Sequence, residues 1–352
     1  MALQPLFGGA STDATLTPDI EPRAMPTQSN QPLPDGYKLL DYRIDSVLSC
    51  GGFSIVYLAY DVNDQPVAIK EYLPSHLVLR REGDVLPSIA DDHVATFRYG
   101  LKCFFEEGRS LARLSHPNVV RVLNFFRANE TVYLVMRYER GRTLQEHIQL
   151  RRGAISENFI RHAFAQLLNG LREVHTNRLL HLDIKPANIY MRNDGTPLLI
   201  DFGGARQTLA AEGDGPGKRM LKPMYTPGFA PPEQYRDRQR LGPWSDIYAV
   251  GATIHACLAG MAPQPADKRL EDDKYQPATR LWAGKYSRQL LETIDWCLEL
   301  DHLQRPQSVF GLQKVLLRQR DPVVRIPVAG LLGAMQSRLQ RVACALGVSS
   351  KA

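Results

Sequence analysis

The eight residues 181–188, His-Leu-Asp-Ile-Lys-Pro-Ala-Asn, constrain this chain more than any other stretch. They bring a carboxylate at Asp183, an ammonium at Lys185 and a carboxamide at Asn188 into one short segment. A carboxylate can accept a proton, an ammonium can neutralise a transferring anion, and an amide oxygen can bind a hard cation, and phosphoryl transfer needs all three. Alone, an Asp beside a Lys is more often an exposed ion pair. The interpretation therefore depends on whether the rest of the chain agrees.

Composition narrows the class of protein. The chain has 352 residues, of which 44% are hydrophobic and 23% charged, so we expect a globular protein with a large core. The net charge of +6 is spread along the chain, and we expect no nucleic-acid-binding surface. The five cysteines are far apart and form no CxxC pair. This spacing disfavours a disulfide framework and a zinc site and is typical of a reducing compartment.

Neither end of the chain predicts a folded domain of its own. Residues 1–35 are rich in proline and polar residues and predict a disordered leader without the features of a signal peptide. Residues 321–352 predict an amphipathic tail. Packing of this tail on the protein's own helices is the favoured interpretation, and docking to a soluble regulatory partner or weak contact with a membrane surface are the alternatives. No uncharged apolar run reaches the ~20 residues of a transmembrane helix, so we expect a cytoplasmic protein with no transmembrane segment.

The first third of the chain beyond the leader predicts an antiparallel sheet with one helix. Short runs rich in β-branched and aromatic residues, separated by turn residues, predict strands at 39–48, 55–60, 66–72, 119–126 and 131–138. Apolar residues that recur every three or four positions predict a helix over 96–114. Residues 76–95 show no regular pattern.

Two features of the predicted sheet have alternative interpretations. Gly51 and Gly52 lie between two strands, where they form either a plain hairpin turn or a backbone flap over phosphates. Lys70 ends an apolar strand, where it either reaches water or pairs with an anion. Glu107, within the predicted helix, is the natural partner for that ammonium.

The remainder of the chain predicts helices. They are expected at 143–150, 157–176, 244–259, 287–298 and 307–318, with Ser156 as the N-cap of the second. A strand over 197–200 leads into Asp201-Phe202-Gly203, and a long loop rich in Gly and Pro follows to about residue 232.

In order along the chain, the motifs are the Gly51-Gly52 flap, the strand-end Lys70, the loop of Asp183, Asp201-Phe202-Gly203 and Ala230-Pro231-Pro232-Glu233. From about residue 37 to 318 the chain resembles the protein kinase superfamily, and more narrowly the bacterial eukaryotic-like (Hanks-type) serine/threonine protein kinases. The resemblance implies an α+β, bilobal kinase-like fold. The kinase domain would span residues 36–320, with an N-lobe of an antiparallel sheet plus one helix over 36–139 and a mainly helical C-lobe over 140–320.

The resemblance also implies a site for ATP and Mg²⁺, with Mn²⁺ as a substitute cation. The residues that would bind the nucleotide and its metal are Ser49, Gly51, Gly52, Phe53, Val56, Ala68, Lys70, Met136, Arg137, Glu139, Asn188 and Asp201. Of these, Asn188 and Asp201 would hold the metal, since a hard cation prefers oxygen ligands. Phe53 would lie at the tip of the flap, and Met136 would be the gatekeeper.

Catalytic roles follow from the same resemblance. Asp183 would orient the acceptor hydroxyl and take its proton, and Lys185 would steady the γ-phosphate. Lys70 would bind the α- and β-phosphates and pair with Glu107. Thr226 is placed like the threonine that shapes the acceptor site. Away from the chemistry, the resemblance implies that Asp246 braces the catalytic loop and that Arg305 pairs with Glu233.

Three departures from the family pattern qualify these implications. Ser49 and Ser54 replace flap glycines and should stiffen the loop. Arg137 replaces the usual hinge glutamate, which is harmless if the backbone makes the hinge contacts. Leu182 replaces the arginine that in relatives grips a phosphorylated activation loop, so we predict activity that does not depend on such phosphorylation.

The resulting functional prediction is a serine/threonine protein kinase that transfers the γ-phosphoryl of ATP to Ser/Thr hydroxyls of protein substrates. The main alternative is a pseudokinase, a nucleotide-binding scaffold without turnover. A small-molecule phosphotransferase on the same fold is disfavoured, because such relatives lack the long loop closed by a Pro-Pro-Glu signature.

Overall fold

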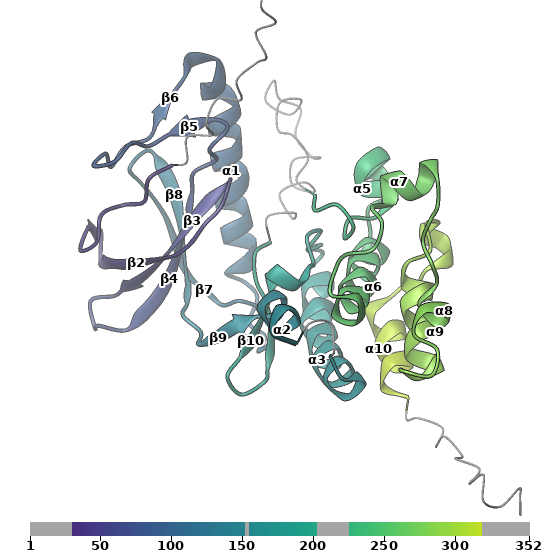
Figure 1. The fold of residues 1–352 in the computed structure, drawn as a ribbon. Coiled ribbons are helices and arrows are strands. Elements are labelled where there is room, and N and C mark those ends of the chain that lie inside the picture. The colour runs from purple at the N-terminus through teal and green to yellow at the C-terminus, as the bar shows by residue number, and fades with distance from the viewer. Residues whose placement is uncertain (1–29, 152–154, 203–224, 319–352) are drawn as a thin grey trace, which may run out of the picture.

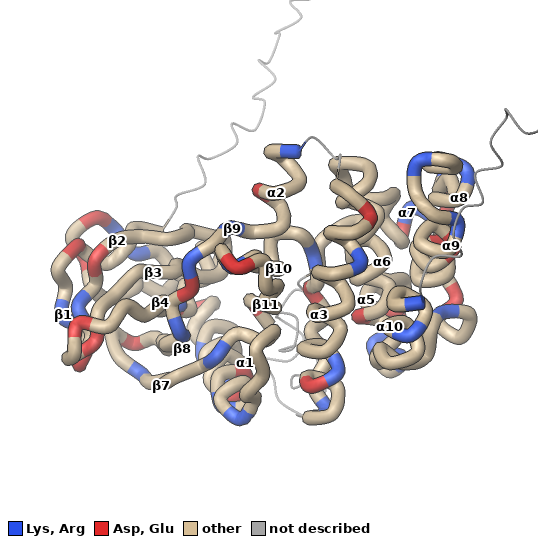
Figure 2. The backbone as a smooth tube through the Cα atoms, turned by 90° about the horizontal axis from the view of Figure 1, so that it is seen from below, with Lys and Arg blue, Asp and Glu red and all other residues tan. Residues whose placement is uncertain are grey.

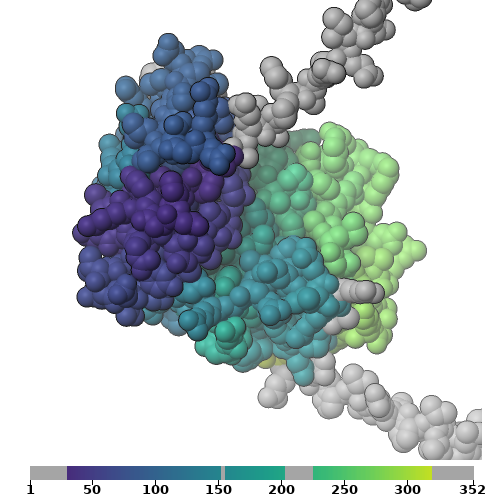
Figure 3. Space-filling model, turned by 60° about the vertical axis from the view of Figure 1, so that its left-hand side comes forward, coloured from purple at the N-terminus to yellow at the C-terminus, as the bar shows by residue number. Residues whose placement is uncertain are grey.

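A sheet of six strands with one long helix forms the first part of the protein, and helices dominate the second (Figure 1). The computed structural model describes residues 30–151, 155–202 and 225–318. Figure 3 shows the purple and blue N-lobe beside the teal and green C-lobe. The predicted two-lobed α+β fold is confirmed.

The N-lobe sheet is antiparallel, with strand order β1-β2-β3-β4-β8-β7. Its strands are β1 Lys38–Leu39, β2 Tyr42–Cys50, β3 Ser54–Tyr60, β4 Pro66–Tyr72, β7 Val122–Ala128 and β8 Thr131–Arg137. In β3 every second side chain is buried, as the alternation predicts. The first predicted strand is split in two, because Leu40 adopts a left-handed backbone conformation (φ 52°) that turns the chain between β1 and β2.

One helix, α1 Val94–Leu111, packs against β7 and β8. Gly108 permits the close approach, since a Cβ at this position would lie 2.5 Å from Cδ1 of Leu134. The helix ends three residues before the predicted boundary. Upstream of α1, the segment without a regular pattern contains the small pair β5 Val78–Leu79 and β6 Ser88–Ile89, followed by a 3₁₀ turn, η1 Asp91–His93.

The chain just before β1 belongs to the folded N-lobe. Asn30 and Leu33 are 5% and 1% exposed. The Asn30 amide donates to the carbonyl of Leu73 at 3.0 Å and accepts from the backbone N–H of Arg80 at 2.7 Å. The prediction of a disordered leader to residue 35 is therefore wrong for residues 30–35, where buried hydrogen bonds override a polar, proline-rich composition. Residues 1–29 lie outside the described ranges.

The C-lobe is built from helices and one small sheet. Its helices are α2 Leu144–Arg151, α3 Glu157–Thr176, α5 Pro232–Arg236, α6 Pro243–Ala259, α7 Ala266–Glu271, α8 Ala278–Leu281, α9 Arg288–Cys297 and α10 Val309–Leu317, with 3₁₀ turns η2 Pro186–Asn188, η3 Arg238–Arg240 and η4 His302–Gln304. The sheet has strand order β11-β10-β9, formed by β11 Pro197–Leu199, β10 Ile189–Arg192 and β9 Gly141–Thr143. The predicted cap of α3 is confirmed, since the Ser156 hydroxyl accepts from the N–H of Phe159 at 3.3 Å.

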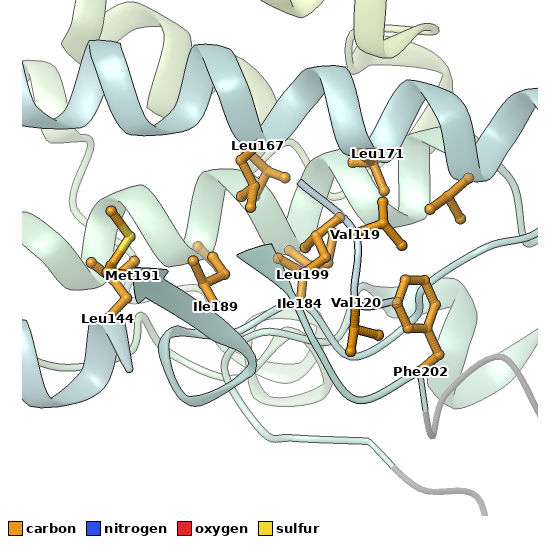
Figure 4. Packing of buried hydrophobic residues seen from close by; sticks show 14 of the residues in the cluster. Val119, Val120, Leu144, Leu167, Leu171, Ile184, Ile189, Met191, Leu199 and Phe202 are labelled. Atoms are coloured by element: carbon orange, nitrogen blue, oxygen red, sulfur yellow. The ribbon is translucent and has the colours of Figure 1, made fainter. Parts of the chain in front are cut away.

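Apolar packing beneath the small sheet fixes the loop of Asp183. Figure 4 shows Leu167 and Leu171 of α3 facing Leu199 of β11, with Ile184 close by. All four side chains are at most 1% exposed. Ile184 thus anchors the loop of Asp183 in the C-lobe core, and this packing holds the polar neighbours of Ile184 at a fixed position.

Charge is distributed as the sequence predicts. In Figure 2 Lys and Arg positions are mixed with Asp and Glu positions over both lobes. Within the described ranges, no helix is long and apolar enough to cross a membrane. The predicted tail, residues 321–352, and most of the predicted loop before residue 232 fall outside those ranges.

His255 of α6 makes stability depend on pH. Its side chain is 7% exposed and packs edge-on against Trp282 with ring centroids 5.1 Å apart. Burial lowers the pKa of His255 to about 4. In the unfolded chain this histidine has the ordinary pKa of about 6.5. As the pH falls from about 6.5 toward 4, the unfolded state therefore binds a proton at His255 that the folded state does not bind, and the folded state loses stability.

We therefore expect His255 to cost about 2 kcal/mol of folding free energy on going from pH 7 to pH 5. Urea denaturation of wild type and His255→Phe at both pH values measures this contribution. The variant should lose less stability than wild type on acidification. Equal losses would show that His255 is protonated as readily in the folded state as in the unfolded chain.

Candidate active site

A cavity of about 540 Å³ lies between the two lobes. Its walls come from β2, β3, β4, β8 and α1 of the N-lobe and from β9, β10, β11 and the η2 turn of the C-lobe. Its size is in the range of small-molecule and cofactor sites. Part of the lining is apolar and includes Val56, Ala68 and Met136. The rest carries charged and amide side chains, among them Lys70, Asn188 and Asp201.

The apolar part of the cavity contains most of the residues predicted to surround the base of a nucleotide. The predicted residues that line the cavity are Ser49, Val56, Ala68, Lys70, Met136, Arg137, Glu139, Asn188 and Asp201, together with Glu107. The sequence analysis missed further lining residues, namely Leu48, Leu111, Val120, Leu134, Gly141, Arg142, Thr143, Glu146, Ala187, Tyr190, Leu198, Ile200 and Phe202. Eight of them are apolar, namely Leu48, Leu111, Val120, Leu134, Ala187, Leu198, Ile200 and Phe202, and in the sequence such residues look like core positions. Only the strand order could have identified them.

Lys70 of β4 is 5% exposed and forms an ion pair with Asp201, with Nζ and Oδ1 2.5 Å apart. Burying an ammonium is costly without such a partner. Glu107 of α1 is 2% exposed and lines the same cavity as both residues. The sequence analysis missed Asp201 as a partner of the ammonium, and the pairing of Lys70 with Glu107 stays a prediction.

The glycine flap packs against the chain that follows β4. The Gly52 carbonyl accepts from the backbone N–H and the hydroxyl of Ser75, at 2.9 and 3.1 Å. The Phe53 ring lies edge-on to His76, with centroids 5.1 Å apart. These contacts hold the flap tip against the chain that follows β4. Gly51, Gly52 and Phe53 are not among the residues that line the cavity, and their contact with a nucleotide stays a prediction.

The polar groups of residues 181–188 converge on Asp183. Its Oδ2 accepts from Lys185 Nζ and from Asn188 Nδ2, both at 2.8 Å. Its Oδ1 accepts from the Thr226 hydroxyl at 2.8 Å, and this hydroxyl also accepts from Lys185 Nζ at 2.8 Å. Residues separated by 43 positions in the chain thus form one network, as expected for Thr226 from its place before Glu233.

Asp246 of α6 positions the loop from behind. Its carboxylate is fully buried and accepts from the backbone N–H of His181 at 2.9 Å and of Leu182 at 2.8 Å, and it contacts the His175 ring at 2.7 Å. Burial acts to raise the pKa of Asp246, but the His175 contact and the N–H donor outweigh it and keep the pKa below its usual range. Leu182 has φ 59°, and the two bonds to Asp246 stabilise this left-handed turn.

A buried ion pair fixes the end of the loop that carries Thr226. Arg305 donates to both carboxylate oxygens of Glu233, at 2.8 and 3.0 Å, and to the carbonyls of Glu299 and Leu300. The Ser245 hydroxyl donates to the same carboxylate at 2.7 Å. The roles expected for Asp246 and Arg305 therefore correspond to observed contacts.

The residues present fit a magnesium ion. Asn188 uses its amide nitrogen for Asp183, which leaves its carbonyl oxygen as the group that can bind a cation. Asn188 and Asp201 line the same cavity. Oxygen ligands supplemented by phosphate are what this cation prefers. In the described part of the chain, no cluster of three or more His, Cys, Asp or Glu residues could hold a metal by itself.

Two lobes, a cleft between them, and acidic and basic groups at the polar end of that cleft are the arrangement that the resemblance to protein kinases implies. The chain belongs to the protein kinase domain family, which matches residues 42–316.

Among curated relatives, serine/threonine-protein kinase C of Synechocystis is 31% identical over 288 residues, covering 79% of this chain and 50% of that protein. Serine/threonine-protein kinase PknL of Mycobacterium tuberculosis is 32% identical over 235 residues, covering 66% of this chain and 53% of that protein. This chain spans between 38% and 53% of the length of the first curated relatives.

Solved structures give the same result for the fold. The apo form of PpkA-294 is 35% identical, with a TM-score of 0.71, and the match covers 81% of this chain and 99% of that one. A mutant form of the kinase domain of Mycobacterium tuberculosis PknI matches with a TM-score of 0.60 at 19% identity, which supports the fold alone.

Proposed function

We propose that this protein is a serine/threonine protein kinase that transfers the γ-phosphoryl group of ATP to hydroxyl groups of protein substrates. The observation that carries the proposal is the network of Asp183, Lys185 and Thr226 at 2.8 Å contacts, next to the cavity that contains Lys70 and Asp201. A general base, a cation for the transferring group and a phosphate-binding lysine are the parts that the reaction needs.

Asp183 is the proposed base. In the transfer, the acceptor oxygen forms a bond to the γ-phosphorus, the bond from this phosphorus to the bridging oxygen of ADP breaks, and the hydroxyl proton passes to the Asp183 carboxylate. The Thr226 hydroxyl occupies Oδ1 in this structure and marks where a substrate hydroxyl would be held. Lys185 Nζ, 2.8 Å from Asp183 Oδ2, would neutralise charge on the transferring group.

ATP and Mg²⁺ are the proposed cofactors. Val56, Ala68 and Met136 would cover the base, and the backbone of residues 137–139 would bind its edge. Lys70 would contact the phosphates. Bound between Asn188 and Asp201, magnesium would neutralise phosphate charge. We further propose a cytoplasmic location, in keeping with the spacing of the cysteines.

Acceptor specificity tests the proposal. The protein is incubated with ATP, Mg²⁺ and three degenerate peptide pools that carry serine, threonine or tyrosine at a fixed central position. We expect phosphate on the serine or threonine pool. Phosphate on the tyrosine pool alone would contradict the proposed substrate class, and the contact of Lys185 with Thr226 would then need another explanation.

Leu182 carries a second proposal, that activity does not require a phosphorylated activation loop. Leu182 is 3% exposed, and its carbonyl accepts from Gln234 Nε2 at 2.9 Å. The loop is thus held by Asp246 and Gln234, through contacts that need no phosphate. We expect Thr208→Ala and Tyr225→Phe to keep kcat/KM within about twofold of wild type.

Steady-state kinetics on one peptide substrate, with mass spectrometry of each preparation, checks this expectation. Thr208 lies outside the described residues, and Thr226 is left unchanged because it contacts Asp183. A strong rise in activity on phosphorylation of Thr208 or Tyr225, lost in the matching variant, would refute the proposed independence.

A further inference from the structure

A second cavity, of about 190 Å³, lies against the segment that joins the lobes. Arg137 and Glu139 line both this cavity and the larger one between the lobes. The full lining is Ser115, His116, Pro117, Val119, Arg121, Arg137, Glu139 and Arg192, and we call it the hinge cavity. None of Asp183, Lys185 and Thr226 belongs to it, so a ligand there leaves the proposed acceptor site open.

The hinge cavity carries excess positive charge. Arg192 forms an ion pair with Glu139, 2.8 Å apart, and its buried Nε has no hydrogen-bond partner among the described residues. Arg121 donates to a neutral acceptor, the carbonyl of Leu114, at 2.7 Å. Within the described ranges neither Arg121 nor Arg137 has a carboxylate partner. Three arginines and one glutamate thus line the cavity, an excess of two positive charges. The two further charges close to His116, those of Glu173 and Arg172, have opposite signs.

His116 adds a donor without adding charge. Its Nδ1 accepts from the backbone N–H of Asn118 at 3.1 Å, so in the neutral ring the proton is on Nε2. Burial lowers the pKa of His116, which keeps the ring neutral near pH 7. Ser115 lies beside it in the lining.

These features match a phosphate monoester. Such a group carries about −1.5 to −2 charges near neutral pH, which equals the excess positive charge of the lining. Its oxygens match the planar fork of donors that the guanidinium groups of Arg121, Arg137 and Arg192 carry. A carboxylate would neutralise only half of the excess. The volume is below the ~300 Å³ at which cofactor pockets begin, and it suits a side-chain phosphate on an otherwise exposed peptide.

We propose that the hinge cavity binds the phosphate of a phosphoserine or phosphothreonine side chain in a partner protein. It would make the hinge a docking point for phosphorylated proteins, separate from the acceptor site. The inference does not depend on the proposed kinase activity, and its test uses no ATP.

Binding of fluorescent peptides tests the docking site. Three degenerate pools, with phosphothreonine, threonine or glutamate at the central position, are titrated with the full-length protein and followed by fluorescence anisotropy. We expect the phosphothreonine pool to bind at least about tenfold more tightly than the other two pools, because only its phosphate can form charge-assisted hydrogen bonds to several arginines at once. Arg121→Gln should lower this affinity about tenfold, Arg121→Lys less, and Arg140→Gln, an exposed arginine outside the cavity, less than twofold.

Each other result would overturn the proposal. Equal affinity for the phosphothreonine and threonine pools excludes phosphate recognition, and equal affinity for the glutamate pool identifies a site for acidic segments instead. Loss of affinity in Arg140→Gln as large as in Arg121→Gln would show a diffuse charge effect. If the melting temperature of Arg121→Gln shows misfolding, Arg137→Gln, at an exposed position, replaces it, and unchanged affinity in that variant would also reject the site.

Discussion

Asp183→Asn is expected to lower the rate of phosphoryl transfer about 10²- to 10⁴-fold, while ATP affinity stays within about threefold of wild type. Asparagine keeps the shape of the side chain and can still contact Thr226 and Lys185, but it cannot take the acceptor proton. The nucleotide cavity is lined by other residues, so binding should persist. Initial rates at saturating ATP and titration with a fluorescent ATP analogue measure the two effects separately.

Asp194→Asn is the matched control. Asp194 lies in the turn between β10 and β11, where it accepts from the N–H of Thr196 at 2.8 Å, and it does not line the cavity. This variant should keep at least half of the wild-type rate. Equal incorporation by wild type and Asp183→Asn would leave a nucleotide-binding scaffold, or a contaminating kinase, as the explanation of any signal.

Arg80→Met is expected to destabilise the protein by about 3 to 5 kcal/mol. Arg80 and Glu71 are both 0% exposed, and the guanidinium donates to the two carboxylate oxygens at 2.6 and 2.7 Å. The hydroxyls of Tyr57 and Tyr133 donate to the same carboxylate, each at 2.7 Å. Without Arg80 the Glu71 carboxylate would stay buried with only neutral donors, and burying a charge in this way is costly.

Urea denaturation measures the loss, and Arg81→Met provides the control because Arg81 is exposed. We expect Arg81→Met to change the free energy of unfolding by less than about 0.5 kcal/mol. The Arg80 guanidinium also donates to the carbonyl of Gln31 at 2.8 Å, so a deletion of residues 1–35 should destabilise in the same direction. A loss below about 1 kcal/mol in Arg80→Met would mean that water or a shifted side chain replaces the arginine.

Local patterns were sufficient for the main elements of the fold. Strands β3 and β4 and helix α3 follow from alternation, from the apolar stripe and from the Ser156 cap, because each signal is contained within a few residues of chain. The buried Arg80 gives no such signal. Arg80 lies in a segment without periodicity, and its buried guanidinium pairs with Glu71. In the sequence Glu71 is only the residue after Lys70 on a predicted strand, and nothing marks it as the partner of Arg80.

Contacts within the site could be predicted where one short motif contains both residues. They could not be predicted where the two residues are far apart in the sequence. Asp183, Lys185 and Asn188 are close in sequence, so their network follows from one short loop. The ion pair of Lys70 with Asp201 joins residues 131 positions apart, which no local pattern connects. The position of the flap depends on Ser75 and His76, whose contacts with Gly52 and Phe53 arise only in the folded N-lobe.

Transfer of label from ATP to protein tests the proposed activity most directly. Wild-type protein and a serine/threonine peptide pool are incubated with Mg²⁺ and ATP labelled at either the γ- or the α-phosphorus, and the labelled product is hydrolysed in acid. If the protein is a kinase, we expect labelled phosphoserine or phosphothreonine from γ-labelled ATP and no labelled phosphoamino acid from α-labelled ATP. Label from the α-position, or no γ-label above that of Asp183→Asn, would contradict it.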